Sequence, residues 1–130
     1  GEVAEMTVIG DVRGKSCIME KFIRGYHQGL LKAAEVLMDA GATEVHSYIT
    51  HGVLSGPAVE RIKGSVMKSL VITDSIEPTD AVKAAPNIRI VPTAPMFAQA
   101  ILNTWNGTSV SSLFDMDTLT PIYEGFYPRP

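Results

Sequence analysis

The chain has 130 residues, of which 45% are hydrophobic and 19% charged, and its 11 basic and 14 acidic residues give a net charge of −3. This length and composition are typical of one globular domain with its own core and exclude a disordered protein. The charge balance argues against a nucleic-acid or acidic-membrane partner, and no apolar run reaches the roughly 20 residues that span a bilayer. A single cysteine cannot form an internal disulfide, so we expect a cytoplasmic protein.

The N-terminal segment is expected to hold two short strands. Apolar residues at positions 6–9 predict the first strand, and the glycines at positions 10 and 14 predict a turn after it. The apolar run at positions 16–19 (SCIM) predicts a second strand, which would be the first strand of the core.

Residues 30–41 predict a helix more clearly than any other part of the chain. Leu30, Ala34, Leu37 and Met38 recur at steps of three and four residues, and Gly41 is suited to the C-terminal cap. Two interpretations of the preceding residues stay open: a strand, a turn and this helix, or one long helix from about position 16. The glycines at positions 25 and 29 favour the first, because each costs about 1 kcal/mol inside a helix.

Strands and helices alternate along the rest of the chain, which implies a parallel sheet with right-handed crossovers. The fold class is therefore α/β, three-layer and Rossmann-like. Ser55 is expected to cap the helix that follows it. The expected strands cover residues 44–50, 69–73 and 88–91, and the expected helices cover residues 58–63, 79–85 and 94–105. The inner face of the last helix is expected to consist of Met96, Phe97, Ala100, Ile101 and Trp105.

The composition changes after Phe114 to a segment that carries prolines and tyrosines. We therefore expect one domain over residues 1–115 and a C-terminal tail over residues 116–130. Exposed aromatic residues among prolines usually dock on another surface, so this tail is expected to contact the domain itself or a neighbouring subunit.

Histidine and cysteine side chains give few signs of chemistry. His46 follows Glu44 on an expected strand and is interpreted as a partly exposed surface residue. His51 stands where a strand meets a glycine-containing loop, at the edge of a parallel sheet that binds ligands, and it either caps the loop or lines a site. Cys17 is expected in the core. No metal-ligand spacing occurs in the sequence, and no catalytic residue is assigned.

One glycine-punctuated basic turn is a candidate phosphate site. Backbone N–H groups that open a helix attract anions, and basic side chains at positions 21 and 24 would add to this attraction. A plain connecting turn is the alternative. The residues of the candidate site are Gly25, Tyr26, His27, Gln28 and Gly29.

Six ordered segments carry a resemblance to a known family: residues 10–15 (GDVRGK), 31–37 (LKAAEVL), 40–43 (AGAT), 50–59 (THGVLSGPAV), 71–76 (VITDSI) and 109–114 (SVSSLF). Together they resemble ribose-phosphate pyrophosphokinase (PRPP synthetase) over nearly all of the chain. The resemblance corresponds to the C-terminal part of that enzyme and implies the type I phosphoribosyltransferase fold. It also implies transfer of pyrophosphate from Mg-ATP to ribose 5-phosphate in nucleotide biosynthesis, by hexamers built from dimers.

Two departures from the family bear on activity. The N-terminal half, with the residues that bind ATP and metal, lies outside the resemblance. The family's ribose-phosphate loop carries two adjacent aspartates, a third acid and a Thr-Gly-Thr-like turn. In an alignment without gaps the acids fall on Lys21, Phe22 and Gly25, and Glu20 is the only carboxylate between Val12 and Ala34. A basic loop repels Mg²⁺ and offers no acceptor to the ribose hydroxyls.

The resemblance also implies a regulatory site. In the family, a Ser-Val-Ser-x-Leu-Phe segment contributes to a phosphate/ADP site at a subunit interface, and here Ser109, Ser111 and Phe114 occupy it. The first hypothesis is a C-terminal domain of PRPP synthetase descent, inactive as written, whose full enzyme would use Mg²⁺ and ATP. The second is a non-catalytic oligomerisation module, with ribose 5-phosphate, phosphate or ADP as ligands and a second copy as partner.

Overall fold

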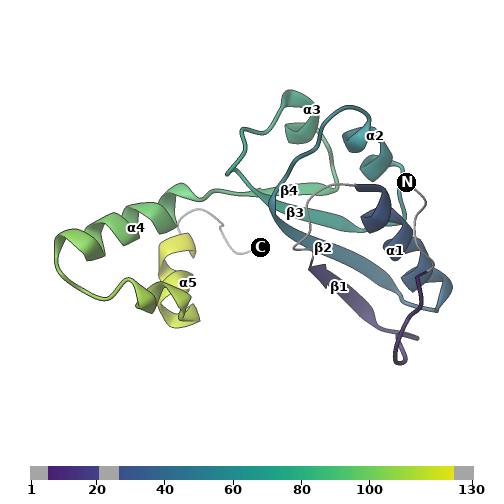
Figure 1. The fold of residues 1–130 in the computed structure, drawn as a ribbon, viewed down its shortest axis with the longest axis horizontal. Coiled ribbons are helices and arrows are strands. Elements are labelled where there is room, and N and C mark those ends of the chain that lie inside the picture. The colour runs from purple at the N-terminus through teal and green to yellow at the C-terminus, as the bar shows by residue number, and fades with distance from the viewer. Residues whose placement is uncertain (1–5, 21–26, 125–130) are drawn as a thin grey trace. The chain divides into compact units, whose positions relative to one another are not determined.

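The structure is a computed structural model that describes residues 6–20 and 27–124. The chain divides into two compact units, Gly1–Val91 and Pro92–Pro130. The first unit contains a four-stranded parallel sheet in the order β1-β2-β3-β4 (Figure 1). Its strands are β1 (Ser16–Glu20), β2 (Glu44–His51), β3 (Ser69–Thr73) and β4 (Ile88–Val91), and its helices are α1 (His27–Asp39), α2 (Ala58–Lys63) and α3 (Asp80–Lys83). The predicted α/β class with a parallel sheet is confirmed.

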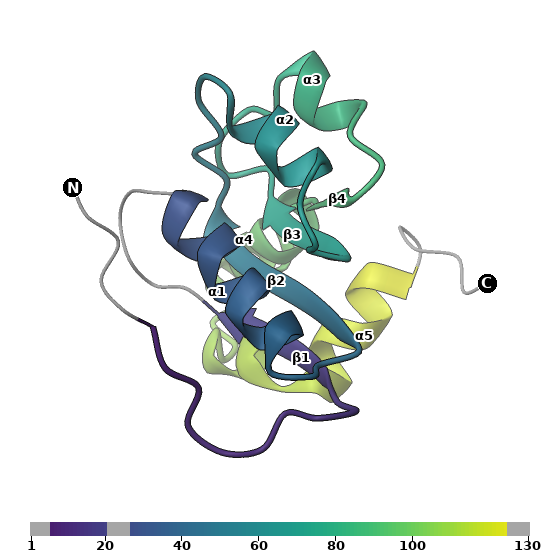
Figure 2. The ribbon, with the colours of Figure 1, turned by 90° about the vertical axis from the view of Figure 1, so that its right-hand side faces the viewer.

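The two faces of the sheet differ in what they carry. One face, which we call the covered face, packs against α1, α2 and α3 and is apolar apart from the buried Ser47. The strand register places Ile18, His46 and Ser69 side by side on the other face, which we call the open face. In Figure 2, α1 lies in front of β2 on the covered face. Among the described residues, the first unit therefore has one helical layer on its sheet.

The core lies between the covered face and the three helices. Leu70 and Ile72 of β3 are almost fully buried and belong to one core cluster with residues of all three helices, including Ile62 of α2. A smaller cluster beside it joins Ala34 of α1 to Val45 of β2. This burial supports the prediction that residues 69–73 form a central strand, since such strands read as continuous apolar runs.

The start of the chain agrees with the prediction in part. The strand β1 and the helix α1 are separate, so one long helix from position 16 is ruled out. Gly41 has a φ of 98°, in the left-handed region that suits the end of a helix. β1 lies at an edge of the described sheet. Residues 6–9 do not form the predicted strand: no strand within residues 6–20 and 27–124 pairs with them, and Ile9 is 97% exposed.

The helix α2 begins where the sequence predicted it, but its predicted cap is wrong. Pro57 occupies the position before the helix, and no side chain there accepts a hydrogen bond from the first turn. By contrast, the side chain of Thr79 accepts a hydrogen bond from the N–H of Val82 at the start of α3.

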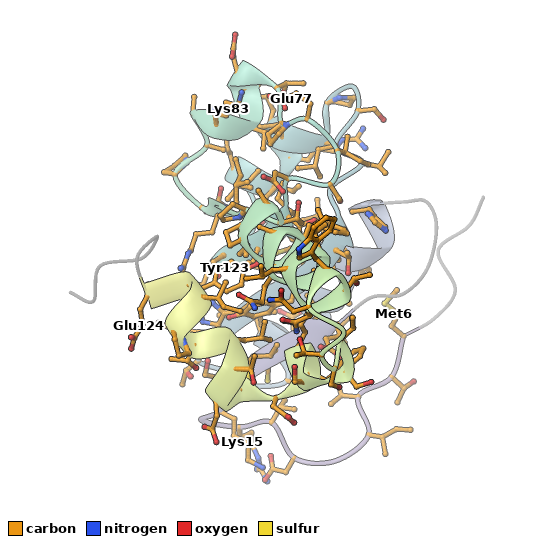
Figure 3. The ribbon with its side chains drawn as sticks, turned by 90° about the vertical axis from the view of Figure 1, so that its left-hand side faces the viewer. Met6, Lys15, Glu77, Lys83, Tyr123 and Glu124 are labelled. Carbon is orange, nitrogen blue, oxygen red and sulfur yellow. The ribbon has the colours of Figure 1, made fainter. Side chains whose placement is uncertain are left out.

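The second unit contains α4 (Ala94–Trp105), a 3-10 helix η1 (Ser111–Phe114) and α5 (Met116–Glu124). The residues predicted as a tail therefore include a helix, and the division by contacts falls at Val91. The hydroxyl of Tyr123, labelled in Figure 3, donates a hydrogen bond of 3.0 Å to the carbonyl of Pro92. This bond ties α5 to the first residue of the unit.

The prediction that these residues of α4 face inward is wrong for Phe97, Ile101 and Trp105. Phe97 is 58% exposed, Ile101 70% and Trp105 87%. These side chains recur every four residues and share one stripe of the helix, as the periodicity predicted, but the stripe faces solvent. The buried residue of α4 is Asn103. The helix ends at Trp105 as predicted, Asn106 forms its C-terminal cap, and Gly107 follows with a φ of 65°.

Candidate functional site

The carboxyl ends of the four strands form the edge at which parallel sheets bind ligands. A cavity of about 240 Å³ lies there on the open face. Tyr48 and Val71, which are register partners, form part of its wall, and Glu20 lines it at the end of β1. The remaining lining residues are Ile49, Thr50, Ile72, Thr73 and Val91.

A hydrogen-bonded group of side chains joins the end of β2 to the end of β3 and the loop that follows β3. The hydroxyl of Thr73 lies 2.6 Å from the carbonyl oxygen of Thr50 and 2.9 Å from the hydroxyl of Ser75. His51 Nδ1 lies 2.8 Å from the same Ser75 hydroxyl. His51, the last residue of β2, thus stands at the predicted sheet edge and connects β2 to the loop after β3, and its neighbour Thr50 lines the cavity.

The backbone around His51 is shaped by a register shift and a close approach. The pairing of β2 with β3 shifts between Ile49 and His51. At Gly52, a Cβ atom would lie 2.7 Å from the Cδ1 atom of Ile72. Glycine at this position therefore lets the loop run close over the buried β3 strand.

The predicted phosphate turn falls only partly within the described residues. Gly25 and Tyr26 lie outside them, while His27, Gln28 and Gly29 form the first turn of α1. Because α1 follows β1, its N-terminus starts at the carboxyl edge of the sheet, as a phosphate site requires. The proposed anion binding itself stays a prediction.

His46 and Cys17 differ in their surroundings. His46 lies on the open face, where Nδ1 is 2.7 Å from the hydroxyl of Ser69 and Nε2 is 3.2 Å from a carboxylate oxygen of Glu44. This hydrogen bond from His46, together with the charge of Lys68, holds the pKa of Glu44 below its ordinary value. Cys17 is a free thiol that packs, half-buried, against the smaller core cluster.

The predicted regulatory residues lie in the second unit. The carbonyl of Ser109 accepts hydrogen bonds of 2.8 Å from the side chains of Asn103 and Ser112. Ser111 begins η1, and Phe114 ends it with 88% of its surface exposed. The ring of Phe114 is thus exposed, and no motif in the sequence pointed to Asn103, whose side chain holds this segment through Ser109.

Among residues 6–20 and 27–124, no group of three His, Cys, Asp or Glu side chains is arranged to hold a metal ion. Within the same part of the chain, no helix combines the length and the apolar character that crossing a membrane requires. Sequence reasoning missed Tyr48, Thr73 and Ser75 as residues of the carboxyl edge. Strand alternation could have placed Tyr48 with His46, but the bonds among the hydroxyls depend on loop geometry.

Comparison with known proteins decides the family. A family model described as the phosphoribosyl synthetase-associated domain matches residues 2–115. The chain belongs to this family. It is 74% identical over 129 residues to a ribose-phosphate pyrophosphokinase of Cereibacter sphaeroides (strain KD131 / KCTC 12085), covering 99% of this chain and 38% of that enzyme. The corresponding protein of Rhizobium meliloti (strain 1021) is 53% identical over 115 residues, covering 88% of this chain and 37% of that enzyme.

A solved structure supports the same assignment. The crystal structure of phosphoribosylpyrophosphate synthetase from Mycobacterium smegmatis matches with a TM-score of 0.69 and 29% sequence identity. The match covers 76% of this chain and 33% of that chain. The predicted resemblance to PRPP synthetase is therefore confirmed, and the chain spans little more than a third of the length of the relatives it matches.

Proposed function

We propose that this chain is a C-terminal domain of ribose-phosphate pyrophosphokinase that, with the residues it carries, does not form PRPP. Family membership and the similarity of the fold support the first part of this proposal. The second part is supported by one feature, the connection between β1 and α1. The relatives that carry the name of this enzyme are much longer than this chain. The link to the ATP-dependent reaction of the full enzyme, and a cytoplasmic location, are therefore parts of this proposal.

The connection at positions 21–26 reads KFIRGY and contains two basic residues and no acid. It begins directly after Glu20, which lines the cavity at the carboxyl edge. One carboxylate beside two cations is a poor donor set for Mg²⁺, which prefers carboxylates together with substrate phosphates. The residues present therefore do not fit a magnesium-bound ribose phosphate. Lost positioning and charge stabilisation of this kind typically removes several powers of ten in rate.

We expect no PRPP formation from ATP and ribose 5-phosphate when this chain is mixed with the separately expressed N-terminal part of the Cereibacter sphaeroides relative. The measurement is AMP and PRPP release at saturating Mg²⁺. The matched control pairs the same N-terminal part with the corresponding C-terminal segment of the relative itself, which shows whether two separate pieces can assemble. Turnover in our mixture comparable to this control would disprove the proposed inactivity.

The second candidate function is a non-catalytic assembly module, favoured by the stripe of Phe97, Ile101 and Trp105 on α4. This helix carries no charged residue over its twelve positions. A charge-free helix with an exposed apolar stripe is typical of a surface that is buried in an assembly. A second copy of the chain is the partner that this candidate names.

We expect an oligomer in light scattering at micromolar concentration, and conversion toward monomer when Ile101 is replaced by aspartate. Phosphate or ADP is expected to raise the melting temperature if Ser109, Ser111 and Phe114 retain the family's regulatory site, because a ligand that binds only the folded state stabilises it. The control is Ala81→Asp, which adds the same single charge at an exposed position of α3, outside α4. A monomer that is indifferent to both ligands would eliminate the assembly module.

A further inference from the structure

We propose that Ser69, His46 and Glu44 form a nucleophilic triad on the open face of the sheet that cleaves activated esters with small apolar acyl groups. The three side chains come from two neighbouring strands. Glu44 and His46 lie two positions apart on β2, and Ser69 is the register partner of His46 on β3. The inference concerns the amino-terminal half of these strands and is independent of the proposed PRPP synthetase ancestry.

The hydrogen bonds connect a nucleophile, a base and an orienting carboxylate. The hydroxyl of Ser69 lies 2.7 Å from His46 Nδ1, and Glu44 lies 3.2 Å from His46 Nε2. Lys68 Nζ is 3.5 Å from the other carboxylate oxygen of Glu44. Nucleophilic hydroxyls are activated by this order of contacts, which is recognised by geometry and not by sequence position.

The charge of Glu44 determines the direction of these bonds. The pKa of Glu44 is lowered by its hydrogen bond with His46 and by the charge of Lys68, so the carboxylate is ionised near neutral pH and can only accept. In the neutral imidazole, Nε2 must then carry the proton, which leaves Nδ1 as an acceptor. The hydroxyl of Ser69 consequently donates to Nδ1, as a serine that is about to lose its proton must do.

The neighbouring surface suggests the substrate class. Tyr48 and Val71 follow His46 and Ser69 by two positions on the same face, about 6–7 Å along the strands. Both line the cavity of about 240 Å³, a volume suited to a short acyl chain. On the other side of His46, its register partner Ile18 is 66% exposed. An ester whose carbonyl lies over Ser69 can therefore place an apolar acyl group against Tyr48 and Val71.

The reaction balances without a cofactor. Ser69 Oγ attacks the carbonyl carbon while its proton moves to His46 Nδ1, and Glu44 stabilises the resulting imidazolium. The tetrahedral adduct then loses the alcohol oxygen, which takes the proton from His46, and an acyl-Ser69 remains. Water attacks this ester with His46 again as the base, releasing the carboxylic acid and restoring Ser69. Activated esters are the appropriate class because their good leaving groups need little further stabilisation of the oxyanion.

The test uses the full chain with p-nitrophenyl butyrate, following release of p-nitrophenol and locating the butyryl group by peptide mass spectrometry. We expect a single adduct on Ser69. His46→Gln should lower the acylation rate by about 100-fold, the usual contribution of a general base. Ser69→Ala should remove the adduct, and Ser69→Cys should restore it as a thioester. Ser16→Ala is the control, because this serine lies on the same face but opposite Glu44.

Circular dichroism and thermal melting establish that each variant is folded, so that a lost adduct reports on chemistry. If Ser69→Ala does not fold, the comparison of His46→Gln with wild type and the site of the adduct in wild type still decide the matter. The proposal is overturned if wild type gives no adduct, if the butyryl group lies on another residue such as Lys68, or if His46→Gln reacts as fast as wild type.

Discussion

Replacing Leu70 by alanine is expected to lower the free energy of unfolding by about 2–5 kcal/mol. Leu70 is fully buried in the main core cluster, and its register partners in the two neighbouring strands, Ser47 and Ile88, are buried as well. Its removal costs both the transfer of a large side chain from water and the contacts around the remaining cavity. Urea denaturation followed by far-UV circular dichroism measures this loss.

The matched control for this substitution is Ile18→Ala. Ile18 is of similar size and also lies on a strand, but it belongs to the open face and is 66% exposed. Its replacement should change the unfolding free energy by less than about 1 kcal/mol. Equal losses in the two variants would contradict the placement of the core on one face of the sheet.

Introducing the missing acids, as Lys21→Asp, Phe22→Asp and Gly25→Asp together, is expected to raise the affinity for ribose 5-phosphate with Mg²⁺ by about 100-fold. A hydrogen bond to a charged group contributes about 1.5–3 kcal/mol, so two bonds from carboxylates to the ribose hydroxyls give at least this factor. The cavity beside Glu20 and the start of α1 at the same edge provide the rest of the frame. Isothermal titration calorimetry measures the change.

The triple variant also makes the chain more acidic by four charges, so its control must do the same elsewhere. Lys63→Asp and Lys83→Asp together provide this change at the ends of α2 and α3, away from the carboxyl edge. Their exposed ion pairs contribute little to stability. The control should leave affinity unchanged. If the triple variant binds ribose 5-phosphate no better than the control, the prediction is wrong, and the missing acids are not the only reason why the carboxyl edge does not bind this ligand.

The sequence predicted elements well where local pattern and tertiary environment agree. Residues 69–73 form an apolar run that only a buried strand can accommodate, and the structure places them as β3. Residues 6–9 show a similar apolar pattern but do not form a strand. A strand also needs a neighbouring strand to pair with, and a local sequence pattern does not show whether one is there. For α4, periodicity correctly grouped Phe97, Ile101 and Trp105, but it does not tell whether anything covers the stripe.

The candidate sites show the same boundary between local and non-local information. His51 could be placed at the carboxyl edge because the end of a strand and a following glycine are both visible in the sequence. The contact of His46 with Ser69 could not, because it depends on the register of β2 against β3 over a separation of 23 residues. A shift of one position would turn every side chain to the opposite face.

The exposed position of Trp105 has a practical consequence. It is the only tryptophan in the chain, and 87% of its surface is exposed at the end of the apolar stripe on α4. Its intrinsic fluorescence therefore reports on one surface without any label. A blue shift of the emission on addition of a subunit, a domain or a ligand would show that the indole of Trp105 has become buried. An unshifted spectrum, with its maximum at long wavelength, would show that the indole is still exposed to water.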